Sequence, residues 1–108
     1  MACEGKSLAA KVNVIFVNDA KIKDLNKRFH HRDTYTDVLA FDLGADKDIV
    51  ISVDTARKNS RLFKTSVQYE LDLYVIHGIL HFLGHNDKTE KQRRAMQNRA
   101  ERILKYVH

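Results

Sequence analysis

One stretch decides how this chain is organised, and it reads His77-Gly78-Ile79-Leu80-His81-Phe82-Leu83-Gly84-His85-Asn86-Asp87. It ends a long, proline-free apolar run that begins at Glu70, and such a run predicts a helix over residues 70–83. Helical spacing puts the imidazoles of His77 and His81 on one face, one turn apart. Gly84 follows the last apolar turn, where a glycine can adopt the left-handed conformation that ends a helix. The chain is therefore predicted to reverse at Gly84 and to return toward the two histidines.

The pattern His-x-x-x-His-x-x-Gly-x-x-Asp predicts a metal site formed by His77, His81 and Asp87. Zn²⁺ prefers four ligands, and in catalytic sites it keeps one of the four positions open for water. Asp87 is the predicted third protein ligand, and His85 is an alternative third ligand. The expected cofactor is Zn²⁺, one ion per chain, although Fe²⁺, Mn²⁺, Co²⁺ or Ni²⁺ also suit two imidazoles and a carboxylate.

Two explanations without a metal stay open. Histidines four residues apart on a buried helix can be core residues that hydrogen-bond other groups, and the apolar side chains around His77 and His81 predict a protected position for both. Asp87 can instead start a capping box for the next helix, with Glu90 at its third position. Gly78 inside the helix costs about 0.5–1 kcal/mol relative to alanine, so its presence between the histidines favours a functional site.

The composition predicts an ordinary globular domain. The chain has 108 residues, of which 44% are hydrophobic and 31% are charged, so we expect one domain over residues 1–108. No apolar run approaches the length of a membrane span, and residues 1–6 do not resemble a signal peptide. The single cysteine, Cys3, cannot form an internal disulfide, which agrees with a reducing compartment. We therefore expect a cytoplasmic protein with no membrane partner.

The net charge of +5 is concentrated directly after the predicted metal site. Residues 1–87 contain twelve Lys or Arg and twelve Asp or Glu, whereas residues 88–108 contain seven Lys or Arg and two Glu, a difference of +5. Such a run is either a solvated helix face or a surface that attracts a polyanion. Beside a hydrolytic centre it suits a polyanionic substrate.

The remaining pattern predicts an α+β fold in which helices back a small sheet. Strands are expected over residues 12–17, 34–41 and 48–53, and the last of these is apolar without alternation, as in an interior strand. The short connection over residues 42–47, which contains Gly44, predicts an antiparallel hairpin between the second and third strands.

Three further helices are expected. Asn18 or Asp19 caps a helix that runs to Phe29, and Asp54 caps a second one that carries Ala56, Leu62 and Phe63 on its inner side. The last helix runs over residues 89–106, with Met96, Ala100 and Ile103 at core spacing.

These motifs resemble the YbeY-type endoribonucleases, metal-dependent proteins that act in ribosomal RNA maturation. The family signature reads His-Gly-x-Leu-His-Leu-x-Gly-Tyr-Asp-His, and residues 77–87 follow it at most positions. Family-like segments occur in the expected order at residues 25–29, 36–41 and 48–51, so the resemblance covers residues 12–104. It implies a mixed four-stranded sheet, a Zn²⁺ in a cleft on a buried helix, and hydrolysis of single-stranded RNA. It also implies a role at the 3′ end of a 16S-type rRNA precursor and in ribosome quality control, with a ribosomal subunit or ribosomal proteins as partners.

The chain departs from the family pattern at the site itself. The third family histidine falls at Asp87, and His85 stands where the family has tyrosine. The family arginine that points into the cleft is replaced by His30. Arg28, Arg32 or a protonated His30 are therefore the candidate catalytic cations.

The function that these residues predict is metal-assisted hydrolysis of an RNA phosphodiester. A zinc peptidase is the first alternative, but the residue after the first histidine, which is the general base in His-Glu-x-x-His proteases, is Gly78 here. The second alternative is a non-catalytic protein that binds RNA or the ribosome and holds a structural metal.

Overall fold

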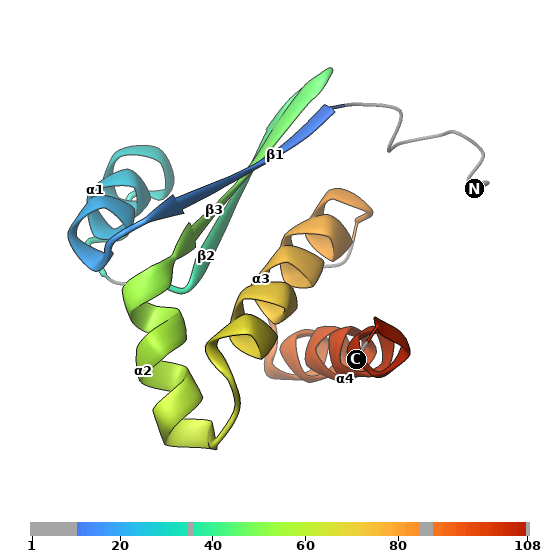
Figure 1. The fold of residues 1–108 in the computed structure, drawn as a ribbon. Coiled ribbons are helices and arrows are strands. Elements are labelled where there is room, and N and C mark those ends of the chain that lie inside the picture. The colour runs from blue at the N-terminus through green and yellow to red at the C-terminus, as the bar shows by residue number, and fades with distance from the viewer. Residues whose placement is uncertain (1–10, 35, 85–87, 108) are drawn as a thin grey trace.

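Three strands and four helices form the fold of residues 11–34, 36–84 and 88–107, which are the residues that the computed structural model describes. In chain order they are β1 (Lys11–Val17), α1 (Asp19–His30), β2 (Val38–Leu43), β3 (Asp46–Ser52), α2 (Val53–Phe63), α3 (Val67–Phe82) and α4 (Glu90–Val107). Figure 1 shows α1 on one side of the sheet and α3 with α4 on the other. The predicted α+β class is confirmed.

The sheet has the strand order β1-β3-β2 and is mixed. Strand β3 pairs with β1 in parallel and with β2 in antiparallel, so that Val14 and Ala40 both lie opposite Ile49. The predicted hairpin is therefore confirmed. The four-stranded sheet that the resemblance implied is wrong for the described residues, which contain three strands.

The second strand begins later than predicted, at Val38 instead of Thr34. The reason is a tertiary contact, since the buried side-chain amide of Asn26 in α1 donates a hydrogen bond to the carbonyl oxygen of Thr34, over 3.1 Å. Thr34 is thereby held against α1, and regular pairing with β3 begins only at Val38.

The central strand β3 carries apolar side chains on both faces. Ile49 and Ile51 belong to the core that α3 and α4 cover, whereas Val50 packs on the opposite face with Ile22 of α1 and Leu39 of β2. Each of these side chains is at most 8% exposed. A strand covered on both faces needs no alternation of polar residues, which confirms the prediction of an interior strand.

Hydrogen bonds from polar side chains cap α1 and α2 and connect the first turns of the two helices. Asn18 caps α1 as predicted, because its side chain accepts the backbone N–H of Lys21. The predicted cap of α2 is wrong, since Ser52 instead of Asp54 accepts the N–H of Thr55. Asp54 accepts the backbone N–H of Asp19 over 3.0 Å, so its carboxylate serves α1 instead.

Two of the α2 residues that were predicted to face the core are exposed. Ala56 and Ser60, four residues apart, are buried, but Leu62 and Phe63 are 68% and 60% exposed. Leu62, six residues after Ala56, projects roughly 120° away from it around the helix. Phe63 lies in the final turn, beyond the packed core. The prediction that Leu62 and Phe63 face the core is therefore wrong.

Helix α4 begins with a capping box at Thr89. The backbone N–H of Gln92 donates to the Thr89 hydroxyl over 3.0 Å, and the Gln92 side chain accepts the backbone N–H of Thr89 over 3.1 Å. The box of Asp87 and Glu90 that the sequence suggests involves Asp87, which lies outside the described residues. None of the helices in the described ranges is long and apolar enough to cross a membrane.

Candidate functional site

The second half of α3 forms the floor of a cavity of about 580 Å³. Both His77 and His81 line it, as expected for two residues one helical turn apart. The other lining residues come from the end of α1, the segment before β2, β2 itself and α4. They are Asn26, His30, Arg32, Thr34, Thr36, Asp37, Val38, Leu39, Ala40, Gly78, Lys88, Arg93, Met96 and Gln97.

Among the described residues, the two imidazoles lack the hydrogen bonds that the metal-free explanation requires. Within the described ranges, neither His77 nor His81 has a hydrogen-bond or ion-pair partner. The predicted protection is correct only in part, since His77 is half-buried and His81 is exposed. His81 lies in the last turn of α3, where the helix passes the edge of the core. Polar side chains without partners at a cavity remain available to a ligand.

Gly78 brings the histidines close to the sheet. A Cβ atom at this position would lie 2.8 Å from Cδ1 and 2.9 Å from Cγ1 of Ile49 in β3. Glycine is therefore required for the close approach of α3 to the central strand. The helix-interior glycine thus has a packing reason, and the approach sets His77 and His81 beside the residues that precede β2.

A second wall of the cavity is held in place by Asn26. Asn26 is 4% exposed, and its side-chain amide donates to the carbonyl oxygen of Thr34, while its backbone carbonyl accepts the backbone N–H of Arg32 over 3.2 Å. His31 ends α1 in the left-handed region, with a φ of 58°, and turns the chain toward the cavity. The sequence does not single out Asn26, although a polar residue four positions after Ile22 on the inner stripe of α1 is a signal for such a role.

The structure separates the three candidate catalytic cations. His30 and Arg32 line the cavity, and the His30 ring lies 5.5 Å from the ring of Phe41. Arg28 is not among the described lining residues. Its guanidinium forms an exposed ion pair with Asp24, four residues earlier, at 3.3 Å. Of these residues, His30 and Arg32 can therefore contact a ligand in the cavity.

Helix α4 and Lys88, two residues before it, supply the third wall and most of the charge. Lys88 and Arg93 line the cavity together with Arg32, and the described lining contains one acidic residue, Asp37. Glu90 forms ion pairs with Arg93 and with Arg94. The hydrogen bond from Arg93 is the main cause that lowers the pKa of the Glu90 carboxyl. The cavity as a whole is cationic, which suits a phosphate group.

The described residues supply two of the ligands that a metal site would need. They offer two imidazoles without partners on one helix face, but they contain no group of three His, Cys, Asp or Glu that could hold a metal ion. Asp87 and His85, the predicted third ligands, lie outside the described residues. Gly84 has a φ of +99°, so the predicted left-handed turn after α3 is confirmed.

The fold and the cavity define a class of small α+β domains in which a core helix presents two histidines to a basic cavity. The sequence profile of the family Endoribonuclease YbeY matches residues 2–108. The chain belongs to the YbeY endoribonuclease family.

Individual relatives support this assignment. The chain is 36% identical to the Endoribonuclease YbeY of Flavobacterium psychrophilum over 109 residues, which cover 97% of this chain and 77% of the relative. It is 39% identical to that of Nautilia profundicola, with 90% and 72% covered. The solution structure of TM1509 from Thermotoga maritima matches with a TM-score of 0.58 and 36% identity, over 84% of this chain and 65% of the other.

Proposed function

We propose that this protein is a metal-dependent endoribonuclease that cleaves single-stranded RNA. The observation that carries the proposal is the cationic cavity with two histidines on its floor, neither of which has a hydrogen-bond or ion-pair partner within the described ranges, in a chain of the YbeY family. RNA is the substrate that the names of the relatives imply.

His77, His81 and Asp87 would hold the metal, which we propose to be Zn²⁺, with His85 as the alternative third ligand. A bound divalent ion polarises a phosphoryl oxygen and lowers the pKa of a bound water. The family pattern has a histidine where this chain has Asp87. A carboxylate ligand reduces the effective charge of the metal, so we expect weaker activation of water than with three neutral imidazoles.

Arg32 and Lys88 would bind phosphates beside the histidines, since both line the same cavity. The His30 ring would donate a hydrogen bond to a phosphate oxygen in the place of the family arginine. The cavity volume of about 580 Å³ lies in the range of pockets for small molecules, so one or two nucleotides fit and both strands of a duplex do not. This size supports the preference for single strands.

The exposed basic residues of α4 extend the cationic surface away from the cavity. They would bind the phosphates of a longer RNA through charge alone. Besides Arg93 of the cavity lining, the exposed basic residues of α4 are Lys91, Arg94, Arg99, Arg102 and Lys105.

We propose that the longer RNA is an rRNA precursor, bound near its 3′ end. A ribosomal subunit or a ribosomal protein would be the partner, and the protein would act in the cytoplasm.

The two alternatives fit the site less well. A zinc peptidase needs a general base after the first histidine, but Gly78 has no side chain and packs on Ile49. A structural metal usually has four protein ligands, often thiolates. The proposed site has three protein ligands and no thiolate, so it fits a non-catalytic RNA-binding protein less well.

The test uses rigorously purified protein and a short single-stranded RNA, with the duplex of the same sequence as control. We expect cleavage of the single strand, loss of cleavage with a chelator, and recovery on addition of Zn²⁺. Unchanged cleavage with the chelator would remove the metal from the proposal. Metal-insensitive RNA binding without cleavage would favour the non-catalytic alternative, and chelator-sensitive cleavage of casein would favour the peptidase.

A further inference from the structure

A second cavity of about 490 Å³ adjoins the first, on the side of the first half of α3. Asp37, His77 and Gln97 line both cavities, so a ligand in one is next to a ligand in the other. The remaining lining residues come from α2, the α2–α3 connection, α3 and α4. They are Asn59, Phe63, Thr65, Tyr69, Glu70, Leu73, Tyr74 and Glu101.

The charge of the second cavity is opposite to that of the first. Its lining contains Asp37, Glu70 and Glu101, and among the described lining residues there is no Lys or Arg. A phosphate is therefore disfavoured in this cavity, whereas a neutral group that donates hydrogen bonds is favoured.

The floor of the second cavity is a fixed polar network. Glu70, at 3% exposure, accepts from the Thr65 hydroxyl over 2.5 Å and from the Tyr74 hydroxyl over 3.1 Å. The Asn59 side-chain amide donates to the Tyr74 oxygen over 2.9 Å. Burial raises the pKa of the Tyr74 hydroxyl, so it keeps the proton that it donates. Because both Glu70 oxygens accept within this network, the lining carboxylates that can face a ligand are those of Asp37 and Glu101.

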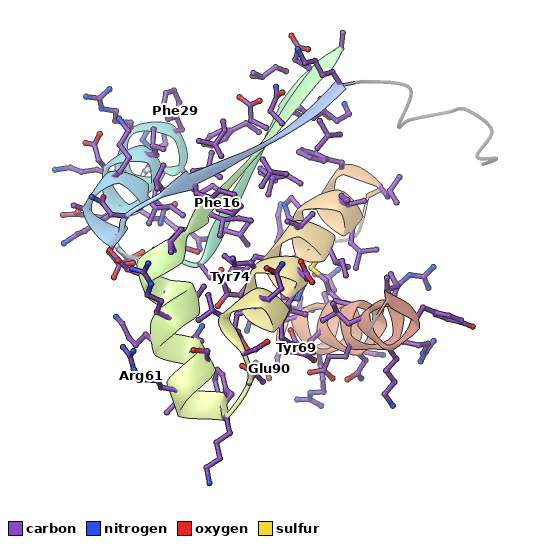
Figure 2. All side chains as sticks on the ribbon, in the orientation of Figure 1. Phe16, Phe29, Arg61, Tyr69, Tyr74 and Glu90 are labelled. Carbon is purple, nitrogen blue, oxygen red and sulfur yellow. The ribbon has the colours of Figure 1, made fainter. Side chains whose placement is uncertain are left out.

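Two aromatic side chains line the same cavity, Phe63 outside the core and Tyr69 partly buried against it. Phe63 lines it and is 60% exposed, although its α2 neighbours Ala56 and Ser60 are buried. Tyr69 lines it from the first turns of α3, and Figure 2 shows Tyr69 and Tyr74 on the same helix. Flat apolar rings beside acceptor groups are the means by which proteins hold unpaired bases of single-stranded RNA.

We propose that the second cavity binds one nucleobase of the RNA strand whose adjacent phosphate lies in the first cavity. Phe63 and Tyr69 stack on the base, and the acidic groups accept hydrogen bonds from its exocyclic amino group. Adenine, cytosine and guanine carry such a group and uracil does not, so the site disfavours uracil. This inference rests on the proposed function, because it takes RNA as the ligand.

The test compares short single-stranded RNAs of equal length, made of adenosine, cytidine or uridine, for binding and for cleavage. We expect the wild-type chain to bind the adenosine and cytidine strands more tightly than the uridine strand. Phe63→Ala should weaken binding of all three by about tenfold, because stacking on one ring is lost. Glu101→Gln, which keeps the shape and removes the charge, should reduce the preference against uridine.

Leu62→Ala is the matched control, since Leu62 is the exposed neighbour of Phe63 and lines neither cavity among the described residues. Thermal unfolding of all variants verifies that they are folded. If wild-type protein cleaves RNA but binds the three strands equally, and Phe63→Ala behaves like Leu62→Ala, the base site is overturned and the ribonuclease proposal stands. If the base preference is found without cleavage, the base site stands and the ribonuclease proposal is overturned.

Discussion

The polar side chains in the two halves of α3 differ in their hydrogen bonding. In the first half, Glu70 and Tyr74 are buried and hydrogen-bonded to each other, to Thr65 and to Asn59. In the second half, His77 and His81 line a cavity and have no hydrogen-bond or ion-pair partner within the described ranges. One helix thus carries a satisfied polar network and, one turn later, an unsatisfied polar pair.

This difference separates stability from function. Groups that are partnered inside the chain lower the free energy of the folded state, and their removal leaves the remaining partners unsatisfied. Groups that lack partners contribute little to folding and are free to bind something else. We therefore expect substitutions in the first half of α3 to change stability and those at the histidines to change metal binding and activity.

The largest expected effect is at the histidines. His81→Ala should reduce RNA cleavage by about a hundredfold or more, because the loss of even an outer partner of a metal ligand costs up to about that much. Bound zinc should fall, while the thermal stability of the metal-free protein should stay unchanged, since His81 has no partner among the described residues. Cleavage is measured with saturating RNA, and zinc by elemental analysis.

The matched control is His31→Asn, because His31 is exposed, lines neither cavity, and has a positive φ that asparagine tolerates. Asp87→Ala and His85→Ala identify the third ligand, since the one that lowers bound zinc is the ligand. Undiminished zinc in both His81→Ala and Asp87→Ala would contradict the metal site.

The second expected effect lies at the boundary between the two halves. Gly78→Ala should destabilise the fold by about 1–3 kcal/mol, the usual cost of overpacking, because the new Cβ would meet Ile49 at 2.8 Å. Chemical denaturation measures this cost. Ile49→Ala removes the clashing atoms, so the double variant should lose less stability than the sum of the two single variants. Additive losses would show that Gly78 is not required for the contact between α3 and β3.

A smaller effect is expected in the first half. Tyr74→Phe removes a hydroxyl that donates to Glu70 and accepts from Asn59, and should cost about 1–2 kcal/mol of unfolding free energy. Zinc binding by the variant should equal that of the wild-type protein. The control is Tyr106→Phe at a residue that is 89% exposed. A loss of zinc in Tyr74→Phe without a loss of stability would contradict the inference that the first half of α3 serves stability and the second half serves metal binding.

The smallest effect is expected at Asp19 in α1, a carboxylate that is hydrogen-bonded within the chain, like the polar groups in the first half of α3. Hydrogen bonds from Ser52, and then from Thr55, lower the pKa of the Asp19 carboxyl. A pKa that is lower in the folded than in the unfolded state gives stability that is present above the unfolded value and is lost as the pH falls through the folded value. Asp19→Asn should therefore cost about 1 kcal/mol or less at neutral pH and progressively less in acid.

This prediction is measured by urea denaturation between neutral pH and pH about 3, which spans the usual pKa of an aspartate. Asp33→Asn, at an exposed residue, is the control. A stability difference that does not change with pH would mean that Asp19 contributes through packing and not through its charge.

Much of the fold was predictable from the sequence because the signals are local. The i, i+4 spacing of His77 and His81, the left-handed Gly84 and the Asn18 cap depend on residues within one or two helical turns. The hairpin between β2 and β3 depends on a short connection between two β-rich runs. The helix cap at Ser52 was mispredicted because Asp54 is also a good capping residue, and local preference alone does not choose between neighbours.

The site depends on contacts that no local pattern records. Packing decides that Arg32 lines the cavity and Arg28 does not, because Asn26 holds the segment after α1. It also decides that Gly78 serves the contact with Ile49 and that Phe63 stands at a second cavity.

Local sequence thus sets most helices and strands, the paired histidines and the excess of positive charge. Which cations face those histidines, and where acidic side chains gather beside them, depends on how the elements pack. The two kinds of feature differ in the range of the contacts that set them. Helices, turns and caps are set by groups a few bonds apart, whereas a cavity is set by side chains from elements distant in the chain that packing brings together.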